Sequence, residues 1–242
     1  MEIIPAILPK DFAELEEKIE LVAGVLIEQN ASASGPTIQI DICDGKFTPK
    51  PGWPYKKHDN NFEAILAEER GLPRWEDVDF EMDLMIADPE LEIEKWIASG
   101  AKRLVIHFKS TKNLDRIIGE LQGLVEIGIA IDLETPVDDI APFINDIDFV
   151  QCMGIAKPGF QGQPFDDRVI AKVRELKERF TERLVSVDGG VNMETAPLLR
   201  DAGADRLIIG SAIFDSENIA ETIEGFEGVL FACVIICGVK VN

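Results

Sequence analysis

Residues 37–45 read TIQIDICDG, and the alternation in this stretch decides the fold. Isoleucines occupy positions 38, 40 and 42, and they alternate with Gln39, Asp41 and Cys43. A period of two is typical of a β-strand with one apolar face and one polar face. Because an ionised carboxylate is costly to bury without a partner, Asp41 predicts one of two environments. It lies either on the exposed face of an antiparallel sheet or at the polar mouth of a barrel.

The order of the remaining segments favours the barrel. Seven further stretches read as strands: Glu2–Leu8, Phe80–Met85, Arg103–Phe108, Glu126–Leu133, Asp148–Ile155, Arg183–Gly189 and Arg206–Phe214. Amphipathic, helix-like stretches lie between them, at Asp11–Gln29, Pro89–Ser99, Asp138–Asn145, Asp166–Phe180 and Glu194–Ala202. We expect Asp11 to cap the first of these helices.

Eight strands that alternate with helices predict an α/β protein with a (β/α)8 barrel, the TIM-barrel architecture. The alternative is a doubly wound open sheet, but no G-x-G-x-x-G motif opens the first helix. We expect residues 1–228 to form the single barrel domain. Residues 229–242 would form an apolar C-terminal tail, which is too short to cross a membrane because a helical span needs about 20 residues.

Composition limits the partners of the protein. The chain has 242 residues with 45 acidic and 24 basic side chains, so its net charge is −21. This balance argues against nucleic acid, whose phosphates require a basic face. The four cysteines lie in apolar segments, no basic-then-apolar leader is present, and we therefore expect a cytoplasmic protein without disulfides.

Polar residues gather where the predicted strands end. If the isoleucines of 37–43 face the helices, Gln39, Asp41 and Cys43 face the barrel axis. By the same alternation Asp83 and Asp188 point inward, and His107 ends the strand that follows Asp83. Active sites of this fold lie at the carboxyl ends of the strands, so these side chains are expected to converge there. The alternative for each Asp is an ordinary cap or turn role.

Glycine-rich segments lie after the sixth and seventh predicted strands and within the eighth. They read PGFQGQPFD at Pro158–Asp166, DGG at Asp188–Gly190 and GSA at Gly210–Ala212. Glycines let backbone N–H groups approach an anion closely, and phosphate sites of TIM barrels use the loops after late strands. The alternative is plain turn chemistry. The predicted phosphate-binding residues are Gly159, Phe160, Gln161, Gly162, Gly189, Gly190, Gly210 and Ser211.

Six segments together resemble the ribulose-phosphate 3-epimerase family over nearly all of residues 1–226. They are PAILPKDFAELEEKI, QIDICDGKFTP, DLMIADPE, MGIAKPGFQGQPFD, VDGGVNMETAPLLRDAGAD and GSAIF. The resemblance implies a ribulose-phosphate-binding TIM barrel that inverts one carbon of a sugar phosphate. It places the two acid/base aspartates at Asp41 and Asp188. It also implies a pocket lined by Met85 and Met153.

The sequence departs from this family where a metal is expected. The family binds a divalent ion with two His and two Asp, and here Gln39 and Asp83 occupy the two His positions. The resulting set is Gln39, Asp41, Asp83 and Asp188. Since oxygen ligands suit Mg²⁺ and Mn²⁺ better than Zn²⁺, we expect a hard ion and no organic cofactor.

Three functions remain open at this stage. The first is an epimerase that uses two aspartates and an enediolate intermediate, acting on a sugar phosphate as a homo-oligomer. The second is a catalytically altered or inactive phosphosugar-binding barrel. The third is a relative of hexulose-phosphate synthases and decarboxylases, but their Asp-x-Lys-x-x-Asp motif lacks a counterpart because Asp41-Ile-Cys-Asp44 contains no Lys.

Overall fold

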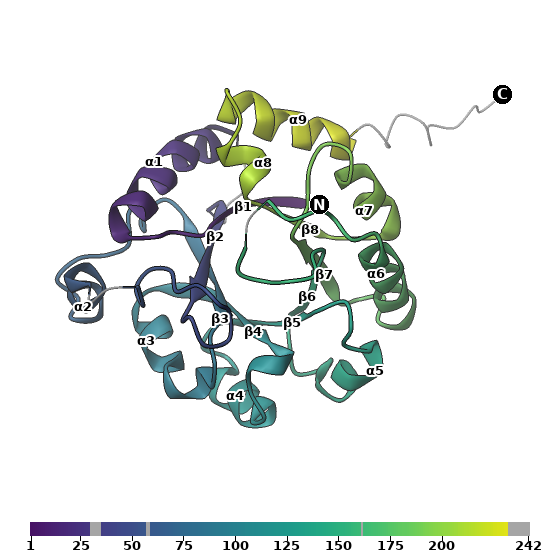
Figure 1. Ribbon diagram of the computed structural model, residues 1–242, viewed down its shortest axis with the longest axis horizontal. Coiled ribbons are helices and arrows are strands. Elements are labelled where there is room, and N and C mark those ends of the chain that lie inside the picture. The colour runs from purple at the N-terminus through teal and green to yellow at the C-terminus, as the bar shows by residue number, and fades with distance from the viewer. Residues whose placement is uncertain (30–34, 57–58, 161, 232–242) are drawn as a thin grey trace.

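The strands close into a parallel barrel. The computed structural model describes residues 1–29, 35–56, 59–160 and 162–231. The strands run in sequence order around a closed barrel, with β8 pairing back to β1 (Figure 1). They are β1 (Glu2–Ile7), β2 (Thr37–Cys43), β3 (Asp79–Met85), β4 (Ala101–His107), β5 (Glu126–Ile131), β6 (Phe149–Met153), β7 (Leu184–Asp188) and β8 (Arg206–Ile209). The predicted (β/α)8 barrel is confirmed.

Helices surround this barrel in an outer ring (Figure 1). The α-helices are α1 (Phe12–Gln29), α2 (Asn60–Leu66), α3 (Ile93–Ala98), α4 (Leu114–Leu121), α5 (Val137–Ile140), α6 (Arg168–Arg179), α7 (Ala196–Ala202), α8 (Ser211–Phe214) and α9 (Ile219–Phe231). Short 3₁₀ turns are η1 (Pro89–Leu91), η2 (Phe108–Ser110) and η3 (Ala141–Phe143). None of the described helices is long and apolar enough to span a bilayer.

Alternation along each strand separates two buried regions. The isoleucines at 38, 40 and 42 belong to the large core between the strands and the helices, as do Val185 and Val187 on β7. The inward positions form small separate clusters on the barrel axis, one of Val105, Ala130, Phe149 and Met153 and one of Ile4, Ala6 and Ile208. The polar residues of TIQIDIC therefore lie inside the barrel, as predicted.

The start of α1 shows how local sequence fixes an element. The Asp11 side chain accepts a hydrogen bond from the Glu14 backbone N–H at 3.0 Å, and the Glu14 side chain accepts one from the Lys10 backbone N–H at 2.8 Å. These contacts satisfy amide donors that the first turn of a helix leaves without intrahelical partners. The predicted cap is confirmed.

Several predicted boundaries are wrong. The apolar run after Arg206 continues in sequence to Phe214, but β8 ends at Ile209 and the short helix α8 follows. The predicted helix Pro89–Ser99 is divided into η1 and α3, and the predicted helix Asp138–Asn145 into α5 and η3. In the first of these, Asp88 has a left-handed backbone and Pro89 starts the 3₁₀ turn. Helix α9 runs to Phe231. Residues 232–242 lie outside the described part, so the expected domain boundary at 228 stays a prediction.

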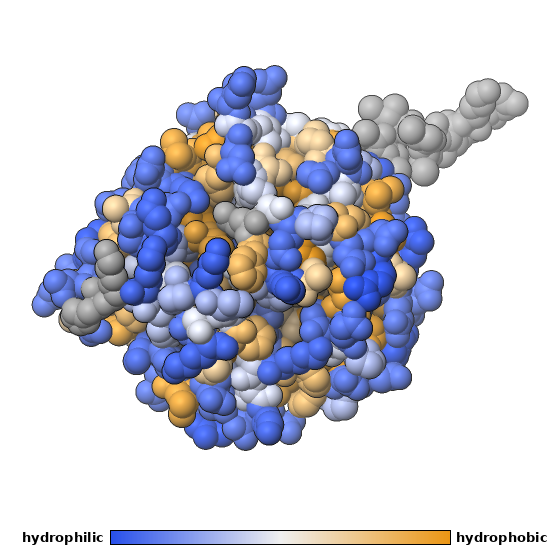
Figure 2. All heavy atoms as spheres, in the orientation of Figure 1, coloured by the Kyte–Doolittle hydropathy of each residue, from blue (hydrophilic) through white to orange (hydrophobic). Residues whose placement is uncertain are grey.

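Ionic residues close the amino-terminal end of the barrel. Glu81 is fully buried, and its Oε2 lies 3.8 Å from Arg103 Nη1. Arg206 pairs with Glu2 at 3.1 Å, and its guanidinium lies 4.8 Å from the centre of the Phe149 ring. On the outer surface, hydrophilic residues predominate over the ring of helices, with hydrophobic residues visible between them and towards the centre (Figure 2).

Candidate active site

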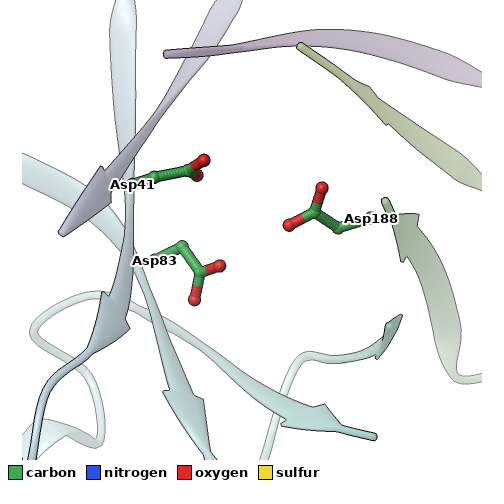
Figure 3. A group of neighbouring side chains, drawn as sticks. All are labelled: Asp41, Asp83 and Asp188. Carbon is green, nitrogen blue, oxygen red and sulfur yellow. The ribbon is translucent and has the colours of Figure 1, made fainter. Parts of the chain in front are cut away.

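Three carboxylates meet at the carboxyl end of the barrel. Asp41 on β2 and Asp83 on β3 are register neighbours, and Asp188 ends β7 on the other side of the opening. Figure 3 shows Asp41 and Asp83 pointing towards Asp188 across the barrel. One oxygen of each carboxylate lies within 4.8 Å of the other two. The predicted convergence of these side chains is confirmed, and each of them lies within the last three residues of its strand.

Two buried amides hold these carboxylates. Gln39 Nε2 donates to Asp41 Oδ1 at 2.8 Å and reaches Asp188 Oδ2 at 3.5 Å. Gln151 Nε2 on β6 reaches Asp83 Oδ2 at 3.3 Å and Asp188 Oδ2 at 3.5 Å. Both glutamines are fully buried. The carbonyl oxygens Gln39 Oε1 and Gln151 Oε1 have no hydrogen-bond partner within the described residues.

His107 contacts the third carboxylate from the end of β4. Its Nε2 lies 2.9 Å from Asp83 Oδ1, and both side chains are buried. The predicted approach of His107 to the aspartates is therefore confirmed. The ring also packs against Phe47, with centroids 5.2 Å apart.

Crowding of like charges makes the pair Asp41 and Asp188 less acidic. Burial, then the neighbouring carboxylates of Asp188 and Asp83, raises the pKa of Asp41 well above its usual range. Burial, followed by the charge of Asp83, also raises the pKa of Asp188. A carboxylate with a raised pKa exchanges a proton more readily at neutral pH, which suits a general acid or base.

A cavity lies above these carboxylates and collects most of the predicted binding residues. It is lined by Asp41, Asp188, Met85, Met153, Gly159, Phe160, Gly162, Gly189, Gly190, Gly210 and Ser211, among others. Gln39 and Asp83 do not line the cavity and are fully buried. Gln161 falls outside the described residues. The acid/base candidates and the predicted phosphate-binding turns therefore share one pocket.

The glycine turns adopt backbones that other residues avoid. Gly159, Gly189 and Gly190 have φ values of +82°, +101° and +71°. A Cβ on Gly190 would lie 2.8 Å from Phe165 Cα, and one on Gly159 would lie 2.7 Å from Thr48 Cβ. The loop after β6 thus packs directly on the loop after β2. Glycine is required at these positions for both conformation and space.

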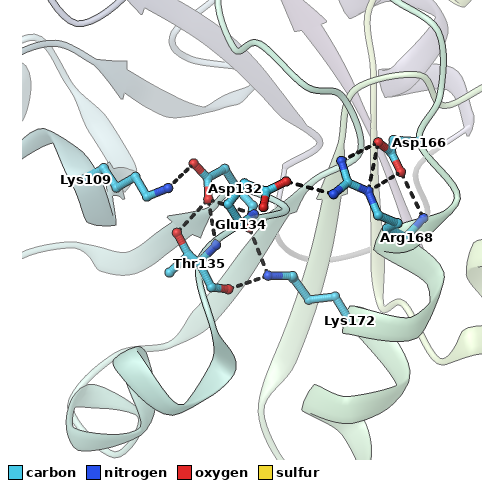
Figure 4. Close-up of polar contacts among 7 residues, drawn as sticks. All are labelled: Lys109, Asp132, Glu134, Thr135, Asp166, Arg168 and Lys172. Atoms are coloured by element: carbon cyan, nitrogen blue, oxygen red, sulfur yellow. Dashed lines mark hydrogen bonds and ion pairs between the residues drawn. The ribbon is translucent and has the colours of Figure 1, made fainter.

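Ionic contacts fix the rim beside this loop. Lys109 pairs with Asp132 at 2.7 Å, and Arg168 pairs with Glu134 at 2.7 Å and with Asp166 at 2.8 Å (Figure 4). Lys172 Nζ donates to the backbone oxygen of Asp132 at 3.0 Å and to that of Thr135. These contacts tie the loops after β5 and β6 to the start of α6.

The donor set fits a hard divalent cation. Three carboxylates lie within reach of one ion, and repulsion among them would fall if a cation lay between them. Gln39 and Gln151 turn their Nε2 groups towards the carboxylates, so the oxygen donors that converge are those of the three aspartates. Such all-oxygen sets are typical of Mg²⁺ and Mn²⁺ sites.

The sequence reasoning missed Gln151. It lies on the inward face of β6 between Phe149 and Met153, so the same period of two could have placed it beside the carboxylates. Its hydrogen bond to Asp83 joins residues 68 positions apart, so no local sequence pattern predicts it.

Comparisons with known proteins point to one family. The model of the family described as "Ribulose-phosphate 3 epimerase family" matches residues 2–214. The ribulose-phosphate 3-epimerase of Bacillus subtilis is 33% identical over 235 residues, which cover 94% of this chain and 99% of that protein. The enzyme of the same name from Schizosaccharomyces pombe is 28% identical over 226 residues, which cover 93% of this chain and 91% of that protein.

Solved structures with low sequence identity share the fold. The 3-hexulose-6-phosphate synthase of Salmonella typhimurium aligns with a TM-score of 0.66 at 14% identity and covers 95% of this chain and 98% of its own. At that identity the likeness concerns the barrel alone. The family model spans all eight strands and the three aspartates, and so the chain belongs to the ribulose-phosphate 3-epimerase family.

Proposed function

We propose that this protein is a ribulose-phosphate 3-epimerase, which interconverts ribulose phosphate and its C3 epimer by proton transfer. The observation that carries the proposal is the placement of Asp41 and Asp188. They come from opposite sides of the barrel and line one cavity together with three glycine turns. Relatives that bear this enzyme name match almost the whole chain.

The arrangement of groups suits inversion at a carbon next to a carbonyl. Inversion through a planar enediolate needs one acid/base group on each face of the sugar. Asp41 would exchange a proton on one face and Asp188 on the other. The backbone N–H groups of the turns at Gly159–Gly162, Gly189–Gly190 and Gly210–Ser211 would bind the phosphate and so fix which carbon lies between the two carboxylates.

We further propose that this site binds a hard divalent metal ion. Its oxygen ligands would come from Asp41, Asp83 and Asp188, with Gln39 beside them. When bound, such an ion supplies electrostatic stabilisation to the negative charge that develops on the substrate oxygen. Elemental analysis should find Mg²⁺ or Mn²⁺ in the purified protein, and tight stoichiometric Zn²⁺ would contradict the proposal. Replacing Gln39 and Asp83 by His should shift affinity towards Zn²⁺. The cytoplasmic location and the homo-oligomer stay predictions.

A proton-exchange experiment tests the proposed reaction. Ribulose 5-phosphate incubated with the protein in D₂O should lose its C3 proton signal and yield the C3 epimer. The measurement is ¹H NMR with added Mg²⁺, Mn²⁺, Fe²⁺ or Zn²⁺ in turn. No exchange with any of these ions would overturn the epimerase proposal.

A non-catalytic sugar-phosphate-binding barrel is the second candidate. It is favoured by Gln39 and Asp83, which stand where the resemblance places two imidazole ligands. Calorimetric binding of ribulose 5-phosphate without any proton exchange would support this alternative.

A further inference from the structure

Both oxygens of Asp83 are engaged by donors from other strands. Gln151 Nε2 contacts Oδ2 at 3.3 Å, and His107 Nε2 contacts Oδ1 at 2.9 Å. In the tautomer that carries its hydrogen on Nε2, the imidazole donates this hydrogen bond to the carboxylate. The imidazole contact is the shorter of the two. His107 is therefore the main side chain that fixes the orientation of the Asp83 carboxylate.

His107 is itself held in place. It is the last residue of β4 and is 3% exposed. The ring packs on Phe47, and the backbone oxygen of His107 accepts a hydrogen bond from Ser110 Oγ at 2.8 Å. Because the His107 ring is already immobilised, it can hold the Asp83 carboxylate in one orientation. Little conformational entropy of the ring is then lost when Asp83 binds an ion.

His107 lies outside the group of atoms that converge on one point. The three carboxylates reach one another within 4.8 Å, and within the described residues no imidazole belongs to that group. The imidazole contacts Asp83 Oδ1, and it is Asp83 and not His107 that converges with Asp41 and Asp188. His107 therefore supports a ligand and is not placed as a ligand itself.

We propose that His107 is a positioning residue that orients Asp83 as a metal ligand. This inference rests on the metal part of the proposed function. Hydrogen-bond donors that support metal ligands fix ligand geometry, and their loss typically costs roughly 10–100-fold in metal affinity. The effect belongs to metal binding and does not require substrate.

His107→Phe is the discriminating variant, because it keeps an aromatic ring against Phe47 but removes the N–H. His107→Gln is the rescue variant, because its amide N–H has a reach similar to that of Nε2. Phe47→Leu is the packing control, because it alters the ring contact and keeps the imidazole. Mn²⁺ titrations followed by electron paramagnetic resonance on the substrate-free protein give the dissociation constants, and circular dichroism melting checks folding.

We expect His107→Phe to weaken Mn²⁺ binding by roughly 10–100-fold. His107→Gln and Phe47→Leu should remain within a few-fold of wild type. In an Asp83→His background, where the ligand is no longer a carboxylate, His107→Phe should have little further effect on affinity. If His107→Phe does not fold, comparison of His107→Gln with the shorter His107→Asn replaces it, and only His107→Asn should lose affinity.

Three outcomes would overturn the proposal. The first is unchanged Mn²⁺ affinity in His107→Phe, and the second is an equal loss in the Asp83→His background, which would indicate general disruption. The third is wild-type protein that binds neither Mn²⁺ nor Mg²⁺. Because no substrate is present, these results are separate from the deuterium-exchange test of epimerisation.

Discussion

The proposed roles of Asp41 and Asp188 on opposite faces of the sugar can be tested one residue at a time. In Asp41→Asn or Asp188→Asn, one base remains, and it can only return a proton to the face from which it took it. We expect C3 proton exchange to persist in at least one variant while epimer formation falls by roughly 10²–10⁴-fold. Parallel ¹H NMR of exchange and a coupled assay of epimer formation give both rates.

A third Asp→Asn variant serves as the control for the loss of one negative charge. Asp139→Asn changes one exposed carboxylate on α5 and should leave both rates unchanged. Equal loss of exchange and inversion in both site variants would indicate that the aspartates act together on metal binding and not on separate faces.

Glu81 is the residue whose ionisation should affect folding stability most directly. Burial, only partly offset by Arg103 and Arg206, raises the pKa of Glu81 to about 8 from its usual 4.5. The folded protein therefore holds a proton that the unfolded chain has already released between these pH values. The contribution of this site to the free energy of unfolding falls as pH rises from 4.5 to 8, and it is constant above that.

Glu81→Gln removes this titration and keeps the shape of the side chain. We expect the variant to lose less stability than wild type between pH 5 and pH 8.5, by a few kcal/mol. Urea unfolding at several pH values with EDTA present gives the free energy of unfolding as a function of pH for both proteins. If this pH dependence is the same in the variant and the wild type, Glu81 stays ionised beside its two arginines.

Inward residues of single strands were predictable from sequence, but their contacts were not. The period of two in TIQIDIC correctly predicts that Gln39 and Asp41 face the axis. The contact of Gln151 with Asp83 depends on closure of the barrel, which brings β3 and β6 within hydrogen-bonding reach. The same holds for the effect of the Arg206 charge on Glu81. An alternating pattern shows which face of the strand a residue lies on and not which residue it contacts.

At the scale of elements, strand order was easier to predict than helix boundaries. Apolar strands bounded by Gly, Asp and Pro are strong signals, and all eight are present. The end of β8 was missed because Ile213 and Phe214 continue the apolar run, although the chain turns at Gly210 and begins α8. Helix α4 was missed although its buried apolar residues recur at helical spacing, at Leu114, Ile117, Ile118 and Leu121.

The turn between β8 and α8 allows a test of the phosphate site. Gly210→Asp places a carboxylate in the cavity at the proposed phosphate position, so repulsion should abolish measurable binding of ribulose 5-phosphate by calorimetry. Gly119→Asp on α4 adds the same charge at an exposed position where a Cβ meets no neighbour within 4 Å. Undiminished binding in Gly210→Asp would place the phosphate elsewhere.

For the whole molecule, net charge should govern the encounter with an anionic substrate. At a net charge of −21 the protein repels a sugar phosphate over a distance that salt shortens. We expect kcat/KM for ribulose 5-phosphate to rise a few-fold as NaCl increases from low concentration to about 0.15 M. Binding of uncharged ribulose should not respond to salt. A fall in kcat/KM with salt would mean that lysines near the mouth, such as Lys50, attract the substrate locally.

The closed floor of the barrel has a consequence for the order in which ligands arrive. The Phe149 ring fills the space beside Gly128, where a Cβ would lie 2.4 Å from the ring. The Arg206 guanidinium lies over the same ring. Asp83 lies fully buried behind the cavity that the sugar would fill. The proposed ion and the proposed sugar phosphate would then share this entrance, and the ion would enter first. Saturating sugar phosphate should therefore lengthen the residence time of Mn²⁺, so that a chelator strips the metal more slowly from the ternary complex than from the protein alone.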